Sequence, residues 1–84
     1  MKINEFFQKG YYINLDRRPD RKEQFEQEMV TYGLSGFCER FAGLDSIEEP
    51  DHIKKHYYCA QTFYNLYKKI YDEGYENVVI FEDD

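Results

Sequence analysis

The run Asn77-Val78-Val79-Ile80-Phe81 is β-branched and apolar throughout, and it leads directly into Glu82-Asp83-Asp84. Branched and aromatic side chains favour strands. An apolar run without polar alternation is typical of a strand covered on both faces, as in parallel sheets flanked by helices. We therefore predict a buried strand over residues 77–81, with three carboxylates at its carboxyl end.

Two weaker runs upstream are further strand candidates. Residues 11–15 form a short aromatic and branched run, and residues 38–44 form a second one that ends at Asp45. Residues 1–9 are predicted to be a polar lead-in. The chain thus offers three strands, each followed by charged residues.

Two helices are predicted between the strands, over residues 21–32 and from about 52 to 73. Apolar side chains recur at helical spacing on one face of each. In the first helix that face holds Phe25, Met29 and Tyr32. In the second helix the buried stripe is predicted to hold Ala60, Phe63, Tyr67, Ile70 and Tyr71.

Cap residues bound both helices. Asp20, with Glu23 three residues later, resembles a capping box. Gly33 and Gly74 stand where helices often end on a left-handed residue. We expect the helices to end at these two glycines.

The order strand, helix, strand, helix, strand predicts an α/β fold, a parallel sheet with helices against its faces. Ligands of such sheets bind beyond the carboxyl ends of the strands, near the point where strand order reverses. The residues just past the three strands are Asp16-Arg17-Arg18, Asp45 and Glu82-Asp83-Asp84. A functional site is expected where these charged groups meet.

Composition narrows the classes of function. The 84 residues form one domain at most, and the formal charge of -6 argues against a nucleic-acid binder, whose affinity rests on Lys and Arg. The chain has no apolar run long enough to span a membrane and no secretory signal at its start. We therefore expect a cytoplasmic protein without a transmembrane segment, and the sequence assigns no oligomeric state.

Three adjacent carboxylates repel one another unless a cation neutralises them. Mg²⁺ and Mn²⁺ prefer hard oxygen ligands, usually a few carboxylates together with phosphate oxygens and water. Glu82-Asp83-Asp84 is therefore a candidate metal site, and the alternative is a solvated acidic turn.

Arg17, Arg18 and Arg21 stand at a strand end and in the first turn of a helix, where the helix dipole disfavours cations. A diphosphate held by guanidinium groups and free helix N–H groups explains that placement. The alternative pairs these arginines with nearby acids as surface ion pairs, which contribute little to stability.

Three blocks resemble glycosyltransferase family 25, the family of lipooligosaccharide and procollagen galactosyltransferases. The first is Ile-Asn-Leu-Asp-Arg-Arg-Pro-Asp-Arg at residues 13–21. The second is Glu-Arg-Phe-Ala-Gly-Leu-Asp at 39–45, and the third is Val-Val-Ile-Phe-Glu-Asp-Asp at 78–84. Together they cover almost the whole chain in the family's order.

The resemblance implies a GT-A fold, of which residues 1–84 are the amino-terminal donor-binding half, incomplete at the carboxyl end. It implies metal-dependent transfer of a sugar, such as galactose, from a UDP-sugar to a glycan or protein acceptor. The residues implied for the nucleotide-sugar are Leu15, Asp16, Arg17, Arg21 and Asp45. Those implied for Mn²⁺ or Mg²⁺ are Glu82, Asp83 and Asp84.

Two departures from the family pattern bear on activity. The family's Gly-Cys-x-x-Ser-His segment reads Tyr-Cys-Ala-Gln-Thr-Phe at residues 58–63, so Phe63 stands where relatives have His. The catalytic base is expected beyond Asp84, and this chain by itself is expected to be inactive. The alternative is a catalytically inactive remnant or interaction module that keeps the fold. A phosphotransfer domain is disfavoured, because its acids should begin at the first strand, where arginines follow Asp16.

Overall fold

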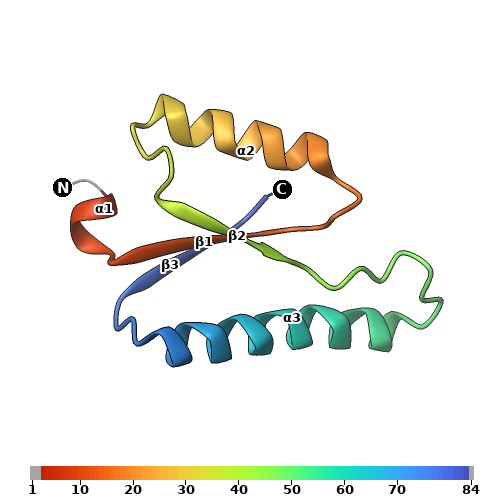
Figure 1. Cartoon of the computed structure of the whole chain (residues 1–84). Helices are drawn as coiled ribbons and strands as arrows, with labels where there is room; N and C mark the ends of the chain where they lie inside the picture. Colours follow the sequence, from red (N-terminus) through yellow and green to blue (C-terminus); the bar gives the residue numbers. More distant parts are fainter. Residues whose placement is uncertain (1–2, 84) are drawn as a thin grey trace.

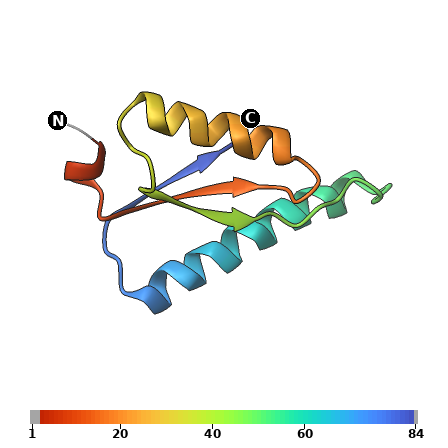
Figure 2. The same ribbon diagram turned by 45° about the horizontal axis from the view of Figure 1, so that its top comes forward.

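The computed structural model describes residues 3–83 as three parallel strands and three helices. In chain order these are α1 (Ile3–Phe6), β1 (Lys9–Asn14), α2 (Pro19–Thr31), β2 (Cys38–Ala42), α3 (His52–Glu73) and β3 (Val78–Glu82). The sheet order is β2-β1-β3, with both pairs parallel. Helix α2 covers one face of the sheet and α3 the other (Figures 1 and 2). The predicted α/β fold with a parallel sheet is confirmed.

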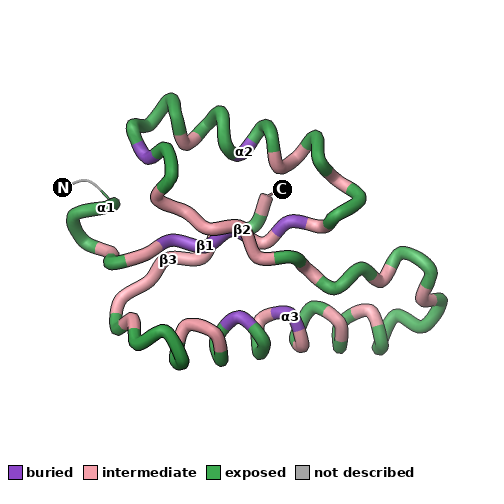
Figure 3. Tube along the Cα trace, viewed as in Figure 1, coloured by how far each residue is buried: buried purple, intermediate pink, exposed green. Residues whose placement is uncertain are grey.

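The core is built on the central strand β1, whose side chains alternate between the two helices. The Tyr12 ring stacks on Phe25 of α2 at 4.4 Å between ring centroids. The Tyr11 ring lies on the other side, where its hydroxyl donates to Glu73 of α3 at 3.0 Å. Tyr11 and Leu66 are fully buried, and Figure 3 shows the buried residues concentrated along β1 and on the inner sides of the helices.

The starts of two elements differ from the prediction. Residues 1–9 were expected to be a lead-in, but α1 forms there and β1 already begins at Lys9. The capping box is wrong, because Pro19 starts α2 and Arg18 is its N-cap, without a side-chain cap. Asp20 therefore lies inside the first turn, where Arg18 binds its carboxylate at 2.9 and 3.0 Å.

The predicted end of α2 is confirmed. Gly33 has φ 73°, in the left-handed region. Its N–H donates to the Val30 carbonyl at 3.1 Å, and the Leu34 N–H donates to the Met29 carbonyl at 2.7 Å. This pair of bonds is the Schellman motif. Gly74 ends α3 in the same left-handed region, with φ 79°.

The predicted buried faces of both helices need correction. In α2, Phe25 is buried but Tyr32 is 72% exposed, because the helix ends at Thr31. In α3 the buried residues are Thr62 and Leu66, not the predicted stripe. The predicted stripe residues are exposed or half-buried: Ala60, Phe63, Tyr67, Ile70 and Tyr71.

Thr62, a polar residue, is buried in the core face of α3 because its hydroxyl is fully hydrogen-bonded there. The Thr62 hydroxyl accepts from the Leu44 N–H at 3.0 Å and donates to the Tyr58 carbonyl at 3.0 Å. Residues 43–44 consequently lie in the loop after β2, which is two residues shorter than the predicted strand.

Strand β3 runs one residue later than predicted and is half-buried rather than buried. Within residues 3–83 it pairs only with β1, so its other edge is open. No helix in this part of the chain is long and apolar enough to cross a membrane.

Candidate functional site

The candidate site lies at the carboxyl ends of β1 and β3. The chain passes from β1 to β2 through α2 on one face, and from β2 to β3 through α3 on the other, so strand order reverses between β1 and β3. Ligands of open parallel sheets bind at such a point. A cavity of about 260 Å³ opens there, lined by Ile13, Leu15, Arg17, Arg18, Arg21, Glu82 and Asp83.

The three arginines of the cavity differ in their partners. Arg17 donates a hydrogen bond to Asp45 at 2.7 Å, and Arg18 donates two hydrogen bonds to Asp20. The surface-ion-pair interpretation thus holds for Arg18, and Arg17 is also paired, with the more distant Asp45. No hydrogen bond or ion pair among the described residues engages the Arg21 guanidinium. Among the three arginines of the cavity, Arg21 is therefore the one without a side-chain partner within residues 3–83.

The Arg18–Asp20 pair neutralises itself. The hydrogen bond from Arg18 holds the pKa of the Asp20 carboxyl at about 2, and the same bond raises the pKa of Arg18. The backbone N–H groups of Asp20 and Arg21 at the start of α2 also lower the pKa of this carboxyl. Because Arg18 and Asp20 bind each other at the start of the helix, recognition of a further anion falls to the Arg21 side chain.

Two of the three predicted metal ligands line the cavity. Asp83 accepts a hydrogen bond from the Asn14 amide at 2.5 Å. Glu82 has no hydrogen bond or ion pair within residues 3–83. Asp84 lies outside the described residues, and in the part that is described no group of three or more ligand side chains could hold a metal ion.

The donor set of the cavity nevertheless suits a hard divalent cation. Mg²⁺ is commonly bound through one or two carboxylates, with substrate phosphates and water completing the octahedron. Glu82 is unengaged, and Asp83 has a second oxygen beyond the one bonded to Asn14. These two side chains fit a cation that shares its coordination with a phosphate ligand.

The other predicted nucleotide-sugar residues lie in different places. Leu15 lines the cavity. Asp16 does not: its side chain is 84% exposed and accepts from Arg40 at 2.6 Å. Asp45 is also outside the lining, held by Arg17 and by the Ile47 N–H at 3.0 Å. The structure thus brings Leu15, Arg17 and Arg21 together with Glu82 and Asp83.

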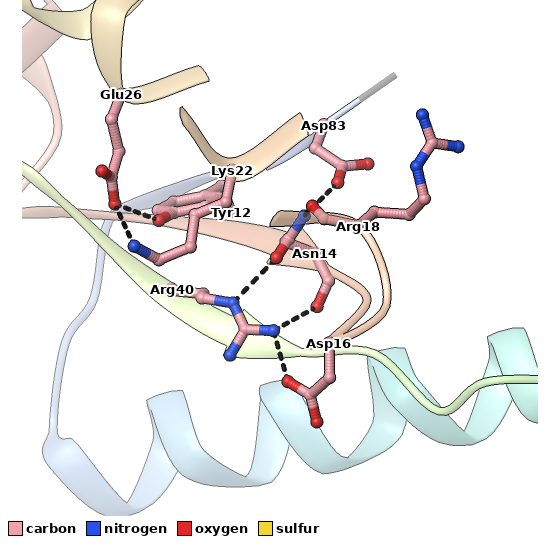
Figure 4. Close-up of polar contacts among 8 residues, drawn as sticks. All are labelled: Tyr12, Asn14, Asp16, Arg18, Lys22, Glu26, Arg40 and Asp83. Carbon is pink, nitrogen blue, oxygen red and sulfur yellow. Dashed lines mark hydrogen bonds and ion pairs between the residues drawn. The ribbon is translucent and has the colours of Figure 1, made fainter. Parts of the chain in front are cut away.

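A buried amide joins the three strand ends (Figure 4). The Asn14 side chain is 2% exposed. Its NH₂ group donates to Asp83 and to the Arg18 carbonyl, and its oxygen accepts from Arg40 at 2.9 Å. Both donors face acceptors and the oxygen faces a donor, so the opposite amide orientation would leave every contact mismatched. No buried side-chain polar atom in the described region lacks a partner.

Arg40 ties β2 into the same network. It pairs with Tyr12 in the β1–β2 register, which brings its guanidinium to the end of β1. There it donates to the Asn14 side chain and backbone carbonyl and to Asp16. Neither Asn14 nor Arg40 was predicted from the sequence as a residue of the site. The available signal was a polar residue inside an aromatic strand and an arginine inside a second strand.

Phe63 lies next to the cavity, although α3 is on the other face of the sheet. It lines a smaller cavity of about 150 Å³ that shares Ile13, Leu15 and Glu82 with the first. Phe63 of α3 therefore adjoins the candidate site.

No protein-family model, no curated protein and no solved structure matches this chain. What the site can do therefore follows from its own residues.

Proposed function

We propose that this chain is the donor-binding half of a metal-dependent glycosyltransferase of the GT-A type, similar to family 25. It binds a UDP-sugar together with Mn²⁺ or Mg²⁺, for transfer of the sugar to a glycan or protein acceptor. The observation that carries the proposal is one cavity at the switch point of the sheet, lined by two carboxylates, Glu82 and Asp83, and by Arg21, which has no side-chain partner within residues 3–83.

The cavity is lined by positive and negative side chains that do not bind each other. Such a lining suits a ligand that carries both a negative and a positive charge. Here the Arg21 guanidinium forms no ion pair with Glu82 or Asp83, although all three line the same space. A diphosphate with its divalent cation satisfies both: phosphate oxygens face the guanidinium, and the cation faces the carboxylates.

Each residue then has a defined task. Asn14 fixes the Asp83 carboxylate, so one ligand is oriented before binding. Glu82 is free to turn toward the cation, and Arg21 binds the diphosphate. A bound cation supplies stabilisation of the charge that grows on the leaving diphosphate. These residues account for donor binding only, so donor binding is the activity to measure.

Calorimetric titration with UDP tests the proposal directly. In the presence of MnCl₂ we expect saturable binding to the full chain, and in excess chelator we expect binding to weaken at least tenfold. Arg21→Gln should weaken UDP binding about tenfold, because a charge-assisted contact to phosphate is lost. The matched control is Lys22→Gln, whose cation is engaged by Glu26 at 3.0 Å and lies outside the cavity lining.

The metal ligands need a separate variant. Glu82→Gln keeps the size of the side chain but removes its charge, so the concentration of Mn²⁺ needed for half-maximal UDP binding should rise several-fold. Glu82 is exposed and unengaged, so the fold should be unchanged by circular dichroism. Absence of any saturable, metal-dependent UDP binding would favour the inactive remnant instead.

A further inference from the structure

The outer side of α3 carries an exposed aromatic seam. Its six residues follow the alternating four- and three-residue spacing of a coiled-coil heptad. They are Ile53, Tyr57, Ala60, Tyr64, Tyr67 and Tyr71. All six are exposed, and the large ones range from 57% for Tyr67 to 84% for Tyr71.

This seam faces away from the sheet. At 3.6 residues per turn, its six positions fall on the side of α3 opposite the buried Thr62 and Leu66. Figure 3 shows the outward turns of α3 as exposed along the helix. The seam from Ile53 to Tyr71 extends over about 27 Å of helix. The outer face of an amphipathic surface helix is normally polar. In α3 that face is apolar, although no residue of the described chain covers it.

The seam is large enough for a specific interface between two proteins. A tyrosine carries about 150–250 Å² of surface, so the four tyrosines at these exposures offer roughly 500 Å² per copy. Two such seams together bury on the order of 1,000 Å² from tyrosines alone, which reaches the lower limit of a specific interface. Ile53 adds to this area.

We propose that the seam pairs with the same seam of a second copy of this chain, α3 against α3 in antiparallel orientation. The six seam positions are spaced symmetrically about position 62 of the helix. A twofold axis that crosses the seam at the level of Thr62 therefore sets Ala60 opposite Tyr64 of the second copy. The outer pairs set Tyr57 opposite Tyr67 and Ile53 opposite Tyr71 of the second copy, so only the central pair joins a small side chain to a large one. Antiparallel packing also opposes the two helix dipoles. This proposal does not depend on the donor-binding function.

Charges beside the seam give the pairing a distinctive signature. Lys54, Lys68 and Asp72 lie on the same flank of α3, and the antiparallel arrangement brings each Lys54 near both Lys68 and Asp72 of the second copy, so these contacts offset one another. Each copy carries a formal charge of -6, so two copies repel and salt screens the repulsion. Self-association should therefore strengthen as salt is raised. An acidic partner protein bound through the same lysines would dissociate instead.

Sedimentation velocity over a range of protein concentrations and at two salt concentrations is the first test. We expect a monomer–dimer equilibrium that shifts toward dimer at higher salt. Tyr64→Lys, at the centre of the seam, should abolish the dimer. Tyr32→Lys replaces a tyrosine that is 72% exposed on the other side of the sheet, so it should leave the dimer unchanged.

Charge reversal tests the orientation. Lys68→Glu replaces repulsion by attraction at both ends of the pair, and we expect roughly fivefold tighter association. Lys54→Glu should tighten association less, because a carboxylate at position 54 also meets Asp72 of the second copy, whereas the double variant restores like charges and returns association to the parent level or below. A chain that stays monomeric at every concentration overturns the proposal. So does a dimer that survives Tyr64→Lys, or tightening in the double variant.

Discussion

The side-chain amide of Asn14 donates a hydrogen bond to the carboxylate of Asp83, which lies 69 positions further along the chain. This bond joins the carboxyl ends of β1 and β3 at the place where the cavity opens. The same amide accepts from Arg40, so a single side chain sets the relative positions of all three strand ends. The residue that orients a proposed metal ligand is therefore also a structural residue of the sheet.

Asn14→Ala should lower the free energy of unfolding by about 2–3 kcal/mol, because it leaves partly buried hydrogen-bonding groups of Arg18, Arg40 and Asp83 without their partner. Urea denaturation measures this. Asn65→Ala removes an exposed amide that accepts only from Gln61, and it should cost less than about 0.5 kcal/mol. Equal losses in the two variants would contradict the central role of Asn14.

The buried hydroxyls of Tyr11 and Tyr12 should make the fold sensitive to alkaline pH. Burial, aided by hydrogen bonds to Glu73 and Glu26 respectively, raises each pKa from 10.0 to about 12. The unfolded chain therefore loses these protons first. The associated stability is complete below pH 10 and is lost as pH rises toward 12, at roughly 1–3 kcal/mol per tyrosine.

Urea denaturation across that pH range is the measurement, with Tyr11→Phe as the partner variant. The phenylalanine does not titrate, so about half of the pH-dependent loss should disappear. An unchanged pH dependence would show that Tyr11 ionises normally in the folded chain.

Thr62→Val should destabilise the chain by about 1–2 kcal/mol, although the two side chains have nearly the same shape. The variant leaves the Leu44 N–H without its acceptor. Thr31→Val is the control, since the Thr31 hydroxyl is exposed and donates only to the Gln27 carbonyl. Thermal unfolding of both variants compares them, and a stabilised Thr62→Val would mean that the α3 face is assigned wrongly.

Gly33→Ala should cost about 1–2 kcal/mol, because alanine resists the left-handed conformation that this residue adopts at the end of α2. Gly33→Asn should cost less, since asparagine tolerates that region better. No atom lies within 4 Å of a side chain added at Gly33, so the loss reflects backbone conformation alone. Similar thermal midpoints for all three proteins would contradict this account.

Periodicity and turn chemistry were sufficient for most of the fold. The bounds of α3, from His52 to Glu73, matched the prediction, and both helices end at the predicted glycines. The buried face of α3 was predicted wrongly because a side-chain scale favours tyrosine over threonine in a core. The Thr62 hydroxyl reverses that preference because it is hydrogen-bonded in the core. Its partner, the Leu44 N–H in the β2–α3 loop, can be identified only from the structure.

The candidate site was predictable to the extent that charged residues follow strands. Arg21, Glu82 and Asp83 could be identified because parallel strands end at one edge. The orientation of the Asp16 side chain and the contacts of Arg40 could not be predicted from the sequence. Both depend on the β1–β2 register, which pairs Tyr12 with Arg40. Sequence shows which groups reach the edge, and strand register decides which of them meet.

Strand β3 is hydrogen-bonded along only one side within the described chain, yet it carries Glu82 and is followed by Asp83. A strand held by one ladder separates from its sheet at lower free energy than the central strand does. A ligand that bridges Arg21 and these acids is bound only while β3 is docked on β1. Docking of the strand and occupancy of the cavity are therefore a single linked equilibrium. Bound UDP and Mn²⁺ should slow amide hydrogen exchange at those residues of Val78–Glu82 whose N–H groups are bonded to β1.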